Sequence, residues 1–113
     1  MNIRRGKIYL ASLDPTIGAE IRKTRPVLVV SNDINNKYNF IVTVLPITSN
    51  VAKIFPFEIY LAKGTGNLPK DSKIKTDQIR TIDKSRLINE IGELSENTLY
   101  EVEKAMKIHL AMK

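Results

Sequence analysis

The chain has 113 residues and no cysteine, which excludes disulfides and thiolate metal sites and fits a reducing compartment. Its 18 basic and 12 acidic residues give a net charge of +6. That balance favours a polyanionic partner (RNA, DNA or an acidic protein segment), although it also simply keeps a small protein soluble. No long apolar run follows the opening MNIRRGK, and no stretch reaches the roughly 20 apolar residues of a membrane span. We therefore expect no signal peptide, no membrane segment, a cytoplasmic location and a single domain over residues 1–113.

The first third of the chain has the pattern of two strands separated by a long loop. Residues 7–13 (KIYLASL) alternate between apolar and polar side chains, which predicts a half-buried strand. Residues 14–24 contain proline and glycine and predict a loop. Residues 26–30 (PVLVV) form a continuous β-branched run, which is typical of a strand covered on both faces. The Asn-rich and Asp-rich residues 31–39 predict a turn.

The middle of the chain continues the strand pattern. Residues 40–47 (FIVTVLPI) predict a strand, with a proline near its end, where a missing N–H is tolerated. Residues 57–62 (FEIYLA) alternate again, and residues 63–71 contain two glycines and a proline and predict a loop. Residues 72–82 (SKIKTDQIRTI) place apolar side chains at 74, 79 and 82, which predicts an interrupted strand.

Helical patterns are confined to the C-terminal part. Asp83 is a candidate cap for a short helical turn over 84–87, and Ser95 is a candidate N-cap for a helix that runs to about residue 112. Leu99, Val102, Met106 and Leu110 recur at helical spacing as one apolar stripe, which also suggests self-association. About five short strands followed by a helix predict an α+β fold: a strongly bent antiparallel sheet or small barrel with a C-terminal helix.

The chain lacks the motifs of several enzyme classes. It has no phosphate-binding glycine loop, no dinucleotide fingerprint and no paired metal-ligand motif. His109 is the only histidine, so a ribonuclease mechanism with two histidines is excluded within one chain. This histidine lies on the predicted C-terminal helix, where a surface or interface position is favoured over a catalytic one.

A cationic loop and a polar strand end form the candidate site. Arg25 closes the basic segment 18–25 (GAEIRKTR) and stands directly before the buried strand, so its backbone is anchored. An anchored guanidinium can bind a phosphate through two hydrogen bonds and stabilise developing negative charge. Thr48 and Ser49, at the end of a strand, can donate to phosphate oxygens. Solvated charges and a turn-forming Thr–Ser pair also explain these residues, so residue types alone leave both interpretations open.

Three separated segments resemble the MazF/PemK toxin family: 5–33 (RGKIYLASLDPTIGAEIRKTRPVLVVSND), 46–49 (PITS) and 71–87 (DSKIKTDQIRTIDKSRL). The similarity extends with the same spacing over about residues 3–110. The resemblance implies an SH3-like barrel of the CcdB/PemK type, a homodimer, and an mRNA interferase that cuts single-stranded RNA at short sequence motifs. It also implies 2′,3′-cyclic phosphate and 5′-hydroxyl ends, no metal or other cofactor, and inhibition by a cognate antitoxin, for which we expect an acidic tail.

The resemblance assigns roles to residues by motif. Arg25 matches the family's catalytic arginine and Thr48 its catalytic threonine. Glu20 matches an acidic loop residue and is the candidate base, with water as the alternative, because arginine stays protonated at ordinary pH. The residues expected to contact RNA are Lys23, Ser49, Lys53 and Gln78. Arg80 lies in the same segment as Gln78 and is expected to contribute to a groove or to have a structural role.

Two departures from the family pattern limit what the resemblance implies. Many relatives have a Gln-Gly-Gly run where this chain has residues 21–23 (Ile-Arg-Lys), so the loop here is stiffer and more cationic. Residues 50–66 also differ in length and residue type, so the cut motif is not carried over. Two other functions of the same fold stay open: a CcdB-like gyrase poison and a non-catalytic RNA-binding module.

Overall fold

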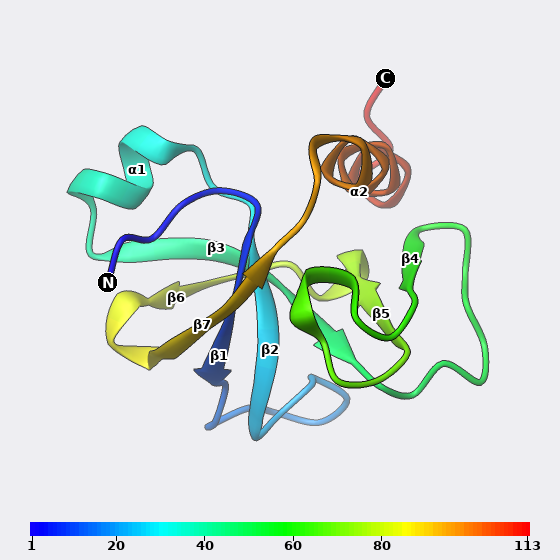
Figure 1. Cartoon of the computed structure of the whole chain (residues 1–113), viewed down its shortest axis with the longest axis horizontal. Helices are drawn as coiled ribbons and strands as arrows, with labels where there is room; N and C mark the ends of the chain where they lie inside the picture. The colour runs from blue at the N-terminus through cyan, green and yellow to red at the C-terminus, as the bar shows by residue number, and fades with distance from the viewer.

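The computed structural model describes all 113 residues and has a seven-stranded sheet crossed by a C-terminal helix (Figure 1). This confirms the α+β class, the antiparallel sheet and the final helix. The strands are β1 (Lys7–Ser12), β2 (Thr24–Val29), β3 (Ile41–Thr48), β4 (Glu58–Leu61), β5 (Ser72–Lys75), β6 (Arg80–Asp83) and β7 (Leu87–Glu93). The helices are α1 (Asp33–Tyr38) and α2 (Glu96–His109), with short 3-10 turns η1 (Thr65–Asn67), η2 (Thr76–Gln78) and η3 (Lys84–Arg86).

Strand β3 is the centre of the sheet. The strands follow the order β4-β5-β3-β2-β1-β7, and β6 also pairs with β3. β6 pairs with Ile41–Val44, whereas β5 pairs with Ile47 and Thr48, so β5 and β6 lie end to end along one edge of β3 with η2 between them. The turn η2 is the interruption that the sequence predicted within residues 72–82. The end of β3 consequently lies between β2 and β5.

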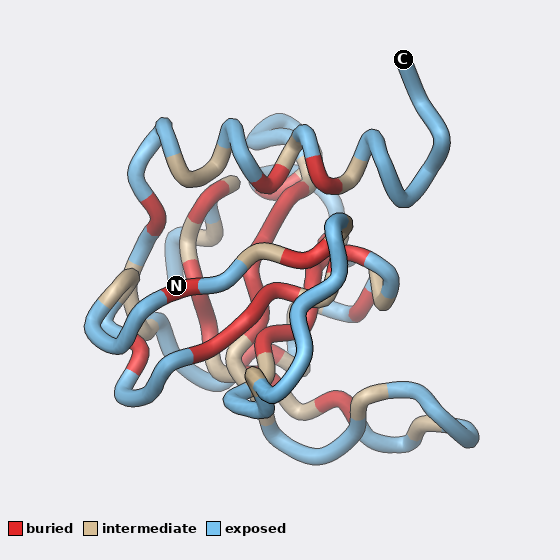
Figure 2. The backbone as a smooth tube through the Cα atoms, turned by 90° about the vertical axis from the view of Figure 1, so that its right-hand side faces the viewer, coloured by how far each residue is buried: buried red, intermediate tan, exposed pale blue.

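Two apolar clusters hold the sheet, one on each face of β2. Val27 and Val29 belong to a cluster with Tyr9 of β1, whereas Leu28 belongs to a second cluster with Val102 of α2. The run PVLVV is therefore covered on both faces, as predicted. Figure 2 shows α2 lying along one side of the sheet with its buried residues toward the strands. Each fully buried valine or leucine side chain contributes about 1.5–3 kcal/mol to folding.

The predicted cap of α2 is confirmed, and three of the four residues of its apolar stripe pack inside the chain, whereas Leu110 is exposed. Ser95 Oγ accepts a hydrogen bond from the Thr98 N–H at 3.2 Å, and the helix ends at His109. Val102 is fully buried, and Leu99 and Met106 pack against the same cluster. The stripe is thus largely used within the chain's own core, so it does not by itself indicate self-association. No helix of the structure is long and apolar enough to cross a membrane.

Two elements differ from the sequence prediction. Residues 31–39 contain helix α1 rather than a turn alone, because Asn32 caps the helix by accepting from the Asn35 N–H at 2.8 Å. Strand β7 was not predicted because it is an edge strand whose only buried residue is Leu87, so it shows no apolar alternation. The short turn after Asp83 is confirmed: Asp83 Oδ1 accepts from the Ser85 N–H at 2.8 Å.

Candidate active site

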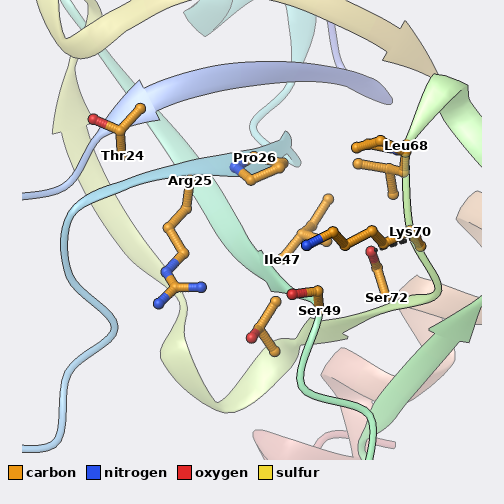
Figure 3. Close-up of a pocket in the computed structure, with 10 residues that line it drawn as sticks. Thr24, Arg25, Pro26, Ile47, Ser49, Leu68, Lys70 and Ser72 are labelled. Atoms are coloured by element: carbon orange, nitrogen blue, oxygen red, sulfur yellow. Dashed lines mark hydrogen bonds between the residues drawn. The ribbon is translucent and has the colours of Figure 1, made fainter.

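A pocket of about 210 Å³ opens where β2, the end of β3 and the segment before β5 meet. Its lining has two cationic side chains, four hydroxyl side chains and no carboxylate: Thr24, Arg25, Pro26, Ile47, Thr48, Ser49, Leu68, Pro69, Lys70 and Ser72. Figure 3 shows the side chains of Arg25, Ser49 and Lys70 directed into the same space. A lining of cations and hydroxyl donors without a carboxylate favours an anionic ligand.

Arg25 reaches the pocket from the start of β2, where it pairs with Ala11 of β1. Its Nε donates to the carbonyl oxygen of Arg22 at 3.1 Å, which orients the guanidinium. None of the salt bridges in the structure includes Arg25. Both terminal nitrogens are therefore available to bind a phosphate through two parallel hydrogen bonds.

Thr48 reaches the pocket from the end of β3, opposite Lys73 of β5 in the register. Its Oγ1 accepts from the Asn50 N–H at 3.2 Å. Because that contact uses an acceptor site of the hydroxyl, the hydroxyl proton remains free to be donated to a ligand. Ser49 follows it as an exposed second hydroxyl of the lining.

The loop before β2 is held against η2 by one side chain. Gln78 Oε1 accepts from the Ile21 N–H at 3.0 Å, and Gln78 Nε2 donates to the Ala19 carbonyl at 3.3 Å. Gln78 is absent from the pocket lining. In this structure its amide therefore contacts the loop that precedes Arg25.

Two arginines anchor the beginning of the same loop. Arg80 Nη1 donates to the Leu13 carbonyl at 3.2 Å. Arg86 Nη1 donates to the Ser12 carbonyl at 3.2 Å and to the Asp14 carbonyl at 2.5 Å. The guanidinium of Arg80 thus makes a structural contact, which was one of the two roles considered from the sequence.

Besides Gln78, the structure leaves three predicted site residues outside the pocket. Glu20 is exposed, and its Oε1 accepts from the Ile17 N–H at 3.0 Å. Lys23 has a left-handed backbone (φ 71°), and its N–H donates to Asp14 Oδ1 at 3.0 Å. Such a conformation costs a non-glycine residue about 1–2 kcal/mol. Lys53 is exposed, with its Nζ 4.6 Å from the centre of the Phe55 ring.

The structure thus brings Arg25, Thr48 and Ser49 together and adds residues that sequence reasoning missed: Thr24, Lys70 and Ser72. Lys70 and Ser72 stand in a stretch predicted only as loop and strand start. Their approach to Arg25 depends on the pairing of β5 with β3, which no local pattern shows. The motif segment 71–87 nonetheless includes Ser72 and was the available signal.

A second charged group lies beside the pocket, and we call Glu58, Lys73 and Lys75 the Glu58 cluster. The fully buried Glu58 carboxylate is 3.1 Å from Lys73 Nζ and 2.8 Å from Lys75 Nζ. Burial alone raises the pKa of Glu58, but hydrogen bonds from Lys75, the Phe55 N–H and Lys73 outweigh burial and hold that pKa below its ordinary value. Lys73 Nζ also donates to the Lys53 carbonyl at 2.6 Å. The cluster therefore ties residues 53–58 to β5.

The remaining candidate groups lie apart from the pocket. His109 is exposed on α2, with its ring centre 5.8 Å from that of Phe57. This is the surface position that the sequence favoured. No group of three or more histidine, cysteine, aspartate or glutamate side chains is arranged to hold a metal ion.

Comparison with known proteins agrees with this geometry. The family described as PemK-like, MazF-like toxin of type II toxin–antitoxin systems matches residues 4–110. The endoribonuclease MazF9 of Mycobacterium tuberculosis (strain ATCC 25618 / H37Rv) is 41% identical over 96% of each chain. Among solved structures, MazF from Deinococcus radiodurans superposes with a TM-score of 0.86 at 27% identity, over 99% of each chain. A MazE–MazF structure from the same organism gives 0.74 at 26% identity, over 100% of each chain. The chain therefore belongs to the PemK-like, MazF-like toxin family of type II toxin–antitoxin systems.

Proposed function

We propose that this chain is a sequence-specific, metal-independent endoribonuclease toxin that cuts single-stranded mRNA in the cytoplasm. The observation that carries the proposal is the convergence of Arg25 and Thr48, from two adjacent strands, on one pocket without a carboxylate. The relative MazF9 is named an endoribonuclease, which supports the same activity here. We assign the activity to the single domain formed by residues 1–113.

The proposed reaction is the attack of a ribose 2′-oxygen on the adjacent phosphorus. The 2′-oxygen–phosphorus bond forms as the bond to the 5′-oxygen breaks, which gives a 2′,3′-cyclic phosphate and a 5′-hydroxyl. Arg25 stabilises the charge that develops on the phosphorane, and Thr48 donates a hydrogen bond to a phosphate oxygen. Because DNA lacks the 2′-hydroxyl, it is at most a ligand and is not cut.

Water is the base that this pocket favours for the 2′-hydroxyl proton. The lining contains no carboxylate or imidazole, and the Glu20 carboxylate accepts from the Ile17 N–H outside it. Glu20 acts as the base only if the loop of residues 13–23 brings it to the pocket. The proton taken from the 2′-oxygen is balanced by one delivered to the leaving 5′-oxygen, for which the Arg25 guanidinium is the candidate donor.

The wider RNA path is proposed to run along the loops beside the pocket. Ser49 extends the hydroxyl lining, and Lys23 and Lys53 are exposed cations on the two flanking loops. Gln78 supports this path by holding the loop before β2, rather than by contacting RNA itself.

Two partners complete the proposal. We expect a homodimer, which is supported by apolar side chains exposed at 73–82%: Ile34, Tyr38 and Phe40. We also expect a cognate antitoxin, because a MazE–MazF structure is among the relatives. An acidic antitoxin tail would occupy the cationic pocket and compete with RNA, and its inhibition would weaken with salt because exposed ion pairs are screened.

A cleavage assay on a long RNA tests the proposal. Purified protein should cut the RNA at a short recurrent motif, equally with and without a chelator, and should leave the matching DNA intact. Mapping the cuts by primer extension and labelling the 5′-hydroxyl ends identifies the chemistry. Binding without cleavage would instead support an RNA-binding module. Inhibition of gyrase without RNA cleavage would support the CcdB-like alternative.

A further inference from the structure

We infer that Lys70 is a second cationic ligand of the scissile phosphate, on the side of the pocket opposite Arg25. The inference rests on the proposed function, because it assigns a substrate contact within that site. The sheet order β5-β3-β2 places the end of β3 between the two cations, since Arg25 opens β2 and Lys70 precedes β5. Lys70 and Ser49 both line the pocket, and Figure 3 shows both side chains directed into it.

The backbone of Lys70 is anchored although its side chain is exposed. Leu68, two residues earlier, is 1% exposed and belongs to the core under α2. Pro69 restricts the backbone directly before Lys70. Ser72 Oγ donates to the Lys70 carbonyl at 2.8 Å. The stem of the lysine therefore starts from a defined position at the pocket wall.

The ammonium of Lys70 has no carboxylate partner. None of the salt bridges includes it, and the neighbouring Asp71 uses its Oδ1 to accept from the Lys63 N–H at 2.8 Å. With no carboxylate in the lining, two unneutralised cations face one small pocket.

That arrangement matches the charge of the reacting group. A phosphodiester carries one negative charge, and a second develops on its oxygens when the 2′-oxygen attacks. Arg25 can bind two oxygens through its planar guanidinium, whereas Lys70 supplies a compact charge for an oxygen on the other side. We therefore expect Lys70 to strengthen the binding of RNA in the ground state and also to stabilise the transition state. A contact made only during the reaction would not strengthen binding.

The test compares Lys70→Ala and Lys70→Arg with the wild type. Its matched control is Lys63→Ala, which removes the same charge from an exposed lysine of the same loop outside the lining. The ligand is an RNA oligonucleotide that carries the mapped cut motif with a 2′-deoxyribose at the cut, so that binding is measured without cleavage. Lys70→Ala should weaken binding about tenfold and reduce the slope of log affinity against log salt by about one. On the cleavable RNA, its kcat/KM should fall at least as much.

Lys70→Arg should restore the salt slope, whereas Lys63→Ala should leave both the slope and kcat/KM close to wild type. A Lys70→Ala protein that matches Lys63→Ala in slope and kcat/KM would overturn the inference while the proposed function stands. A wild-type protein that cuts no RNA would overturn the proposed function and the scissile-phosphate role together. Thermal unfolding of each variant should show that it is folded, because both lysines are exposed.

Discussion

Two groups of cations lie side by side in this molecule, and they differ in whether their charge is neutralised. In the Glu58 cluster, Lys73 and Lys75 share one buried carboxylate at 3.1 and 2.8 Å. In the pocket, Arg25 and Lys70 face a lining without any carboxylate. Strand β5 separates the groups, because Ser72 faces the pocket while Lys73 and Lys75, at alternate positions, face Glu58. Paired cations stabilise the fold, and unpaired cations are available to a ligand.

Removal of an unpaired cation should have the largest effect on function and little effect on stability. Arg25→Ala should reduce the cleavage rate about 100- to 1000-fold, because it removes a charge contact with the transition state. Its unfolding temperature should stay close to wild type, since no carboxylate loses a partner. Single-turnover cleavage and thermal unfolding check this pair of outcomes. Wild-type activity in the variant would exclude Arg25 from the site.

Removal of the buried carboxylate should have the opposite effects: a large loss of stability and little change in function. Glu58→Gln leaves Lys73 without a counter-charge and Lys75 with only Asp77 Oδ1 at 3.5 Å, although both lysine side chains stay partly exposed (10% and 18%). We expect a loss of about 2–3 kcal/mol in the free energy of unfolding, somewhat below that for a fully buried pair. Urea unfolding measures the loss. An unchanged urea midpoint would mean that the Glu58 cluster contributes little to the free energy of unfolding.

The same carboxylate should make stability depend on acid pH. Because the folded pKa of Glu58 lies below its ordinary value of 4.5, its contribution to stability is fully present above that value. The contribution is lost as the pH falls through the lowered pKa. The wild type should therefore lose more stability than Glu58→Gln as the pH falls below that ordinary value. Parallel curves of unfolding free energy against pH for the two proteins would contradict the assignment of this pH dependence to Glu58.

A smaller effect is expected from the side chain that holds the loop before β2. Gln78→Ala removes hydrogen bonds to the Ile21 N–H and the Ala19 carbonyl, each of about 1 kcal/mol. The Ile21 amide should lose protection from hydrogen exchange, and kcat/KM should fall about three- to tenfold. Weaker RNA binding with unchanged exchange at Ile21 would instead support the direct RNA contact predicted from the sequence.

The smallest effect is expected at Glu20. Glu20→Gln keeps an oxygen acceptor for the Ile17 N–H, so the loop should be unchanged. With water as the base, the cleavage rate should stay within about twofold of wild type across the pH range. A strong loss of rate, with a shift of the acidic limb of the pH–rate profile, would identify Glu20 as the base and imply that the loop moves.

The local sequence pattern predicted the elements that have a clear apolar pattern or a capping residue. The run at 26–30 indicated a strand covered on both faces, and Ser95 indicated the start of α2. Strand β7 was missed because an edge strand needs little apolar alternation. Helix α1 was missed because asparagine suits both turns and helix caps.

The two cationic groups were less predictable, because tertiary pairing decides which charges are neutralised. Glu58 occupies a polar position in an alternating strand, and its burial depends on lysines 15 and 17 residues further along the chain. Lys70 resembles any loop lysine until β5 pairs with β3. The family resemblance indicated Arg25 and Thr48, which the structure places in one pocket, whereas residue types alone could not separate them from solvated polar groups.

Besides the core contacts of Leu13 and Ile21, the loop before β2 is held through its backbone. Gln78, Arg80 and Arg86 bind peptide N–H and carbonyl groups of the loop, which every residue except proline presents in full. These contacts do not depend on which side chains the loop residues carry. Exposed residues of this loop, such as Arg22, can therefore diverge while the approach to Arg25 is preserved, whereas Ile21 packs against the core. Under the proposed function, such changes would alter the contacts with RNA beside the pocket without rebuilding the pocket itself.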